Sequence, residues 1–276
     1  MNETRIFDFQ RMNLLMRRDL HENWRHYLLT GATMFGVLAL IALLTDFAQH
    51  DAFHYYNDDM ENWHRHIAFV EIGWMTFALF AWGALVASGT FKSLSTPPTA
   101  LSMLILPASQ TEKFIYRWFV AVPFFFVMFM VCAMLADLIR VGFMVSYYEI
   151  PARPVDWWSL FVHPKEAGYF SGASFMVMAG FFAVQSFFLL GSVVWTRLSF
   201  VKTFVAMMVI GMLYVWFGSW FYDLMEDPDK WYAAPVIFDD ERGFILCLGT
   251  FFSVVALFNY CLAFMRFRES EIINRW

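Results

Sequence analysis

Charged side chains are rare within or next to the long apolar stretches of this chain, and three of them stand out. Glu71 lies within one apolar run, and Asp137 and Arg140 follow the end of another. Asp137 and Arg140 are three residues apart, which places them on one face of a helix. Intramembrane charges usually pair with one another or face a cavity. We therefore expect Arg140 to pair with Glu71, Asp137 or both; the alternative is that each side chain reaches toward interfacial water.

Two neutral polar side chains also lie inside apolar stretches. These are Gln185 and Asn259. Amide side chains in hydrocarbon commonly hydrogen-bond across helix pairs. We expect both residues to join neighbouring helices rather than to line a transport path.

Histidines are concentrated in the segment 50–66, HDAFHYYNDDMENWHRH, which holds four of the seven in the chain. They are His50, His54, His64 and His66. Imidazole and nearby carboxylates are the side chains that bind transition metals. Their spacing matches no defined metal-binding signature, so we expect a hydrated polar loop, with a metal site as the alternative. The sequence assigns no metal and no cofactor.

The elements that must position these residues are long and apolar. Hydrophobic residues make up 60% of the chain and charged residues 16%, whereas soluble domains carry about 25% charged residues. A helical membrane span needs roughly 20 apolar residues. Six stretches qualify, at about 27–45, 67–90, 118–136, 167–196, 203–222 and 243–265. We expect an all-α polytopic membrane protein in which residues 1–276 form a single transmembrane domain.

The distribution of basic residues predicts the orientation of that domain. Thirteen of the nineteen lysines and arginines lie in segments 1–26, 91–117, 197–202 and 266–276. The positive-inside rule places these segments, and with them both termini, in the cytoplasm. The opposite loops are acidic, so the net charge of −5 conceals a polarised molecule. The basic side suits anionic lipid headgroups, and nothing in it indicates nucleic-acid binding.

Residues 6–24 have the pattern of an amphipathic helix. Apolar residues recur at spacings of three or four: Ile6, Phe9, Met12, Met16, Leu20 and Trp24. Arg11, Arg18 and Arg25 recur at a spacing of seven, away from much of that face. Such a helix is typical of the membrane interface. The alternative is a solvated helix packed on protein.

Segment 91–117 predicts two helices separated by a sharp break. A proline after Thr96 favours the start of a short apolar helix at about 98–105, and Pro107 should end it. Ser109 and Glu112 have the spacing of a capping box, which begins a second helix leading through Lys113 into the third span. The apolar residues 101–106 need lipid or a partner protein to cover them.

These segments carry a resemblance to a known family. LPASQTEKF, between the second and third spans, resembles the LPxS-x-x-EK signature of bacterial ABC-2-type transporter permeases, especially those of Bacteroidetes. The basic amphipathic lead-in RMNLLMRRDLHENWRHYLL and the tail NYCLAFMRFRESEI are similar to the corresponding parts of these proteins. The architecture matches over the whole chain, and the motifs match over three short segments.

The resemblance implies a permease half with six helices, which pairs with a second half as a homodimer or heterodimer in the bacterial cytoplasmic (inner) membrane. It implies that loop 91–117 docks on a separate cytoplasmic ABC ATPase subunit. The residues that match the motif, and so the implied coupling residues, are Leu106, Pro107, Ser109, Glu112 and Lys113. We expect an exporter. In one departure from the family, loop 223–242 is too acidic for deep re-entrant insertion.

The chain itself is not expected to be an enzyme. It lacks GxxxxGK[ST], the loop that cradles nucleotide phosphates, so ATP hydrolysis would belong to the partner subunit. Two other functions remain open from the sequence. One is a non-transporting membrane protein, such as an immunity or sensory component. The other is a membrane enzyme that uses the external His/Asp loop.

Overall fold

The described part of the chain is helical. The computed structural model describes residues 7–53, 60–92, 108–148, 152–155, 173–195, 197–225 and 241–270. Its helices are α1 (Phe9–Phe53), α2 (Met60–Gly89), α4 (Gln110–Phe119), the π-helical turn η3 (Val120–Phe124), α5 (Phe125–Tyr147), α7 (Ala173–Val194), α8 (Ser199–Met225) and α9 (Glu241–Ser270). Six helical stretches are long and apolar enough to cross a membrane. The protein is therefore an all-α, multi-pass membrane protein, as predicted.

Helix α1 is longer than the sequence predicted. The amphipathic helix expected at 6–24 and the span expected at 27–45 form one helix of 45 residues. Residues 20–30 contain neither proline nor glycine, so nothing in the backbone interrupts the hydrogen-bonding pattern there. Phe9, Leu20 and Trp24 on its predicted apolar face are exposed, which leaves them free to contact lipid.

The third span is also longer than predicted. Residues expected at 118–136 belong to an unbroken helical stretch from Gln110 to Tyr147, made of α4, η3 and α5. Pro123 lies within it, in the π-helical turn η3. A proline has no N–H to donate and crowds the preceding turn, and a local π turn relieves that conflict without ending the helix. The extension places Asp137 and Arg140 inside a helix.

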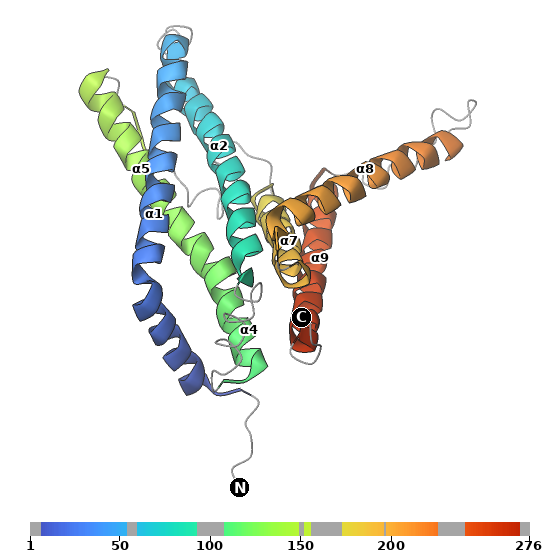
Figure 1. Ribbon diagram of the computed structural model, residues 1–276. Coiled ribbons are helices and arrows are strands. Elements are labelled where there is room, and N and C mark those ends of the chain that lie inside the picture. The colour runs from blue at the N-terminus through green and yellow to red at the C-terminus, as the bar shows by residue number, and fades with distance from the viewer. Residues whose placement is uncertain are drawn as a thin grey trace.

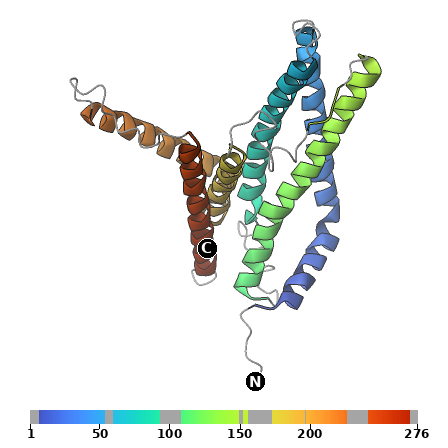
Figure 2. The same cartoon turned by 180° about the vertical axis from the view of Figure 1, so that it is seen from behind.

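The helices form two groups. Helices α1, α2 and α5 run side by side, α7 and α9 pack together next to α2, and α8 projects away from the rest (Figures 1 and 2). One buried cluster joins Leu38 of α1, Leu79 of α2 and Phe129 of α5. A second joins the end of α2 to α4 and α9 through stacked and tilted aromatic rings, and also includes buried residues of α7 such as Leu189. The start of α1 and the end of α9 lie toward the same end of the structure (Figures 1 and 2).

Glycines permit the closest helix approaches. A Cβ added at Gly83 of α2 would lie 2.6 Å from the Phe181 ring of α7, and one at Gly191 of α7 would lie 1.8 Å from Oγ1 of Thr203 in α8. Small residues at helix contacts let the backbones approach closely and gain van der Waals packing. Within a membrane this packing favours helix association, because burial of apolar surface away from lipid gives no hydrophobic driving force. Thr203 is itself buried, so it has little room to yield.

We predict that Gly191→Ala destabilises the protein by about 1–3 kcal/mol, because the new methyl group overpacks the α7–α8 contact. Gly36→Ala is the matched control, since no atom lies within 4 Å of a Cβ built there. Thermal unfolding in detergent would compare the two variants. Adding Thr203→Ala to Gly191→Ala should restore part of the loss. Equal melting temperatures for Gly191→Ala and Gly36→Ala would contradict the predicted clash.

Candidate functional site

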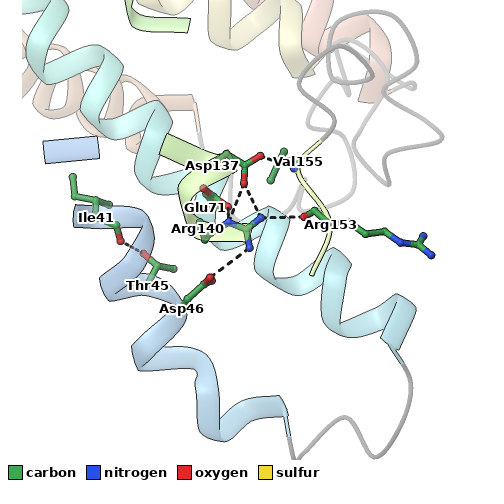
Figure 3. A network of polar contacts seen from close by, with 8 residues as sticks. All are labelled: Ile41, Thr45, Asp46, Glu71, Asp137, Arg140, Arg153 and Val155. Carbon is green, nitrogen blue, oxygen red and sulfur yellow. Dashed lines mark hydrogen bonds and ion pairs between the residues drawn. The ribbon is translucent and has the colours of Figure 1, made fainter. Parts of the chain in front are cut away.

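A group of four charged side chains is buried between α1, α2 and α5 (Figure 3). We call Asp46, Glu71, Asp137 and Arg140 the buried charge cluster; each side chain is at most 2% exposed. Arg140 Nε lies 2.7 Å from Glu71 Oε2, Arg140 Nη2 lies 2.7 Å from Asp137 Oδ1, and Arg140 Nη1 lies 3.5 Å from Asp46 Oδ2. One guanidinium thus serves three carboxylates from three helices.

The short segment 152–155 closes one side of the cluster. The backbone N–H of Val155 donates to Asp137 Oδ2 at 2.7 Å, and Arg140 Nη2 donates to the backbone carbonyl of Arg153 at 3.1 Å (Figure 3). The Arg153 side chain points away from the cluster (Figure 3). These two bonds fix an extended segment against α5 and supply neutral hydrogen-bonding groups to the charges.

An apolar layer lies beyond the cluster. Ile67 and Trp63 are one and two helical turns before Glu71 on α2, and Met144 is one turn after Arg140 on α5. All three are at most 2% exposed and pack together, with Tyr148 and Ala152 partly buried against them. We call Trp63, Ile67 and Met144 the apolar plug. It lies between the buried charge cluster and the point where α2 begins and α5 ends.

The predicted pairing of Arg140 with Glu71 and Asp137 is confirmed, but Asp46 was missed. Asp46 directly follows the apolar stretch 27–45 that predicts the first span, so hydropathy alone does not place it within the membrane. Its position had a detectable signal. Met34, Leu38 and Ala42 are spaced by four residues along the buried face of α1, and Asp46 is the next position in that series.

A second polar network lies at the other end of α5's helical stretch. Glu112 is fully buried and accepts from the backbone N–H of Asp8 at 2.7 Å and of Ser109 at 2.9 Å. Ser109 Oγ accepts from the Glu112 N–H at 3.2 Å, which completes the predicted capping box. Arg11 Nη2 lies 3.2 Å from Glu112 Oε1. We call Asp8, Arg11, Ser109 and Glu112 the N-terminal latch, because it ties the start of α1 to the start of α4.

Two further contacts hold the start of α4 to its neighbours. Asp19 of α1 accepts hydrogen bonds from the hydroxyl groups of Tyr27 and Tyr116, so α1 and α4 meet again two turns further on. Arg117 donates to the backbone carbonyl of Thr90 at 2.7 Å, which joins α4 to the end of α2. Sequence reasoning missed the two contacts between different helices, because no short motif links positions that lie 27 or 97 residues apart.

Gln185 and Asn259 join helices, as expected. Gln185 Nε2 donates to the backbone carbonyl of Ala121 at 2.7 Å, and Asn259 Nδ2 donates to Ser186 Oγ at 3.0 Å. Both side chains lie in buried positions on α7 and α9. The carbonyl of Ala121 belongs to the π-helical turn η3, so Gln185 satisfies part of an irregular backbone.

Several predicted features lie outside the described residues. These are the short helix at 98–105, Leu106, Pro107, His54 and most of loop 223–242; the His50 side chain is also not described. Lys113 is buried beside Glu112 at the start of α4. His64 and His66 lie in the first turns of α2. Within the described ranges, no three His, Cys, Asp or Glu side chains are placed to hold a metal ion.

No family model, no curated protein and no solved structure matches the chain. The resemblance of LPASQTEKF to a permease signature therefore stays a hypothesis. What the structure contributes is the pair of polar networks at opposite ends of one helical stretch.

We predict that Arg140→Gln destabilises the protein by about 3–5 kcal/mol, because it leaves three buried carboxylates without their shared cation. Arg65→Gln is the matched control, since Arg65 is 62% exposed and lies 4.0 Å from the exposed Glu61. Chemical denaturation in mixed detergent micelles would measure both. An Arg140→Gln protein as stable as Arg65→Gln would show that the cluster does not depend on its guanidinium.

Proposed function

We propose that the chain is the membrane-spanning subunit of an ATP-driven transporter of the ABC-2 type. It would lie in the bacterial cytoplasmic membrane with both termini in the cytoplasm, and would act as an exporter. The observation that carries the proposal is the N-terminal latch. Ser109 and Glu112 belong to the segment that resembles the permease coupling loop, and Glu112 ties that segment to the backbone N–H of Asp8 at 2.7 Å. A push on the loop would therefore move α1 and α4 together.

The continuity of α4, η3 and α5 supports the transmission of movement along one helical stretch. Their 38 residues extend roughly 57 Å at 1.5 Å per residue. The N-terminal latch lies at one end, and the buried charge cluster lies in the last third. A displacement of α4 by a docked ATPase would thus reach Arg140 through one helical stretch, and Arg140 contacts both α1 and α2. Access to the opposite side of the membrane would change as these three helices shift.

The motor would be a separate polypeptide. The chain lacks a phosphate-binding loop, and its segment 101–106 is too apolar to remain uncovered in the cytoplasm. An ATPase surface that covers Leu101, Leu104 and Leu106 would explain both features. Lys92 and the basic residues at 113 and 117 flank this segment.

Helix α8 supports pairing of two permease halves. Only 6% of the most apolar part of α8 is buried, whereas 56% of the most apolar part of α7 is buried. It projects from the other helices (Figure 1), and large apolar residues such as Met212, Val215 and Trp216 are exposed along it. A second half, identical or related, would cover part of this surface, and lipid would cover the remainder.

Purification in mild detergent tests the coupling role. The wild-type protein should bring with it an ATPase that contains a phosphate-binding loop, and Leu104→Asp should lose it. Glu112→Gln should keep the ATPase bound but lose ATP-dependent changes in distance between spin labels at Arg65 and Val145. Glutamine has one acceptor oxygen and no charge, so it cannot accept from both N–H groups and also pair with Arg11.

Glu269→Gln is the matched control for Glu112→Gln, because Glu269 forms an exposed pair with Arg266. It should behave as the wild type in both measurements. Absence of any ATPase from the wild-type preparation would contradict the transporter proposal. An unchanged distance response in Glu112→Gln would contradict the role of the latch alone.

Oxidative cross-linking tests the pairing. In a background without Cys132, Cys247 and Cys261, a cysteine at Val215 of α8 should form a disulfide-linked dimer with a second half. A cysteine at Val254 of α9, which is also exposed, is the control and should remain monomeric. Monomer at both positions would contradict pairing through α8.

A further inference from the structure

The buried charge cluster does not balance its own charge. Three carboxylates and one guanidinium carry a formal charge of −2 when all are ionised, and none of the four side chains is more than 2% exposed. An unpaired carboxylate costs several kcal/mol in hydrocarbon, even allowing for the lower values of insertion scales. Buried groups in this situation commonly take up a proton or a cation. Position alone, however, does not say which carboxylate is affected.

The hydrogen-bond donors of Arg140 are divided unequally. Its Nε and Nη2 both donate to Asp137 Oδ1, and Nη2 also donates to the Arg153 carbonyl. Asp137 Oδ2 accepts from the Val155 N–H, so both oxygens of Asp137 are satisfied as an ionised carboxylate. Nη1 faces Asp46. Every nitrogen of the Arg140 guanidinium is therefore directed at an acceptor other than Glu71.

Glu71 is left without a donor. Its Oε2 lies 2.7 Å from Arg140 Nε, but that N–H donates to Asp137, and neither Glu71 oxygen accepts a hydrogen bond of acceptable geometry. The Asp46 oxygens accept none either, but Asp46 Oδ2 lies 3.5 Å from Arg140 Nη1, which donates to neither Asp137 nor Arg153. The hydroxyl-bearing side chain drawn in Figure 3 is Thr45, and its Oγ1 donates to the Ile41 carbonyl instead. A neutral carboxylic acid at Glu71 would reduce the formal charge of the cluster from −2 to −1 and turn one of its oxygens into a donor.

We propose that Glu71 binds a proton in the folded protein, so that the buried charge cluster is an exchangeable proton-binding site between α1, α2 and α5. With Glu71 neutral, the cluster holds Asp46, Asp137 and Arg140 as its charges and its formal charge falls to −1. This inference does not depend on the proposed transport function. It gives the protein a ligand, the proton, at the end of the helices opposite the N-terminal latch.

The surroundings of Glu71 determine how the proton exchanges. The groups that face it are Asp46 from α1, Asp137 and Arg140 from α5, and the backbone groups of Arg153 and Val155. On α2 itself, His64 lies two turns away on the same side of the helix and is partly exposed. The apolar plug of Trp63, Ile67 and Met144 lies between the ends of the helices and Glu71. Exchange with water through this end of the described helices therefore requires the plug to open, which links protonation to the relative positions of α2 and α5.

Infrared difference spectroscopy tests the assignment directly. At neutral pH, the wild-type protein should show the carbonyl stretch of a protonated carboxylic acid, shifted in D₂O. Glu71→Gln should lose this band, and Asp46→Asn should keep it. Loss of the band in Asp46→Asn instead, or its absence from the wild type, would overturn the proposal. So would a stability that depends on added Na⁺ or K⁺ with no such band.

Stability as a function of pH gives a second readout. A glutamate in the unfolded chain ionises above about pH 4.3, whereas the folded protein would keep its proton. The folded state then binds more protons, so the ratio of folded to unfolded wild-type protein should fall by about tenfold per pH unit above that value, until folded Glu71 releases its proton. Glu71→Gln should lack this component, because glutamine resembles the neutral acid.

Asp137→Asn completes the comparison. It should be markedly less stable than Glu71→Gln at neutral pH, because Asp137 accepts three hydrogen bonds as a carboxylate. Failure of Glu71→Gln to fold would overturn the proposal, since glutamine reproduces the shape and charge of a protonated Glu71. An equal pH dependence in the wild type and Glu71→Gln would do the same.

Discussion

Arg140 sets the arrangement of half of the protein. Hydrocarbon cannot solvate charge, so a guanidinium placed inside a membrane span must find its partners in other helices. Arg140 finds them in α1, in α2 and one turn earlier in its own helix. These contacts have fixed directions, unlike the apolar packing around them. They determine which faces of α1, α2 and α5 meet, and the methionine, phenylalanine and alanine side chains of the core then fill the space between these faces.

The same helical stretch carries polar contacts at both ends. At its start, the carboxylate of Glu112 binds the backbone of α1; near its end, the guanidinium of Arg140 binds carboxylates of α1 and α2. Further hydrogen bonds of Tyr116, Arg117 and the Ala121 carbonyl follow within the next three turns, and beyond them the packing of α5 up to Asp137 is mostly apolar. Specific contacts toward both ends and non-directional packing in between allow the stretch to move as a unit, as the proposed transport function requires.

Much of this could be predicted from the sequence, for reasons that are local. Six spans follow from apolar length, the capping box from a four-residue pattern at Ser109, and the pairing of Arg140 with Glu71 and Asp137 from the scarcity of other charges in the membrane. The contacts of Asp46 and of Asp19 with Tyr116 could not be predicted in the same way. They depend on the rotation of each helix about its axis and on the continuity of α1, which hydropathy does not report.

The π-helical turn at Val120–Phe124 has a consequence for how this protein can evolve. Such a turn amounts to one residue inserted into an α-helix, and one residue corresponds to a rotation of about 100°. The wide turn absorbs that residue, so the side of α4 that holds Glu112 and the side of α5 that holds Arg140 keep the phase of a regular helix. A single-residue deletion within the turn would restore an ordinary α-helix and leave the arginine facing its acidic neighbours. The same deletion elsewhere between Glu112 and Arg140, with the π turn kept, would leave the hydropathy profile almost unchanged and yet aim the arginine away from them.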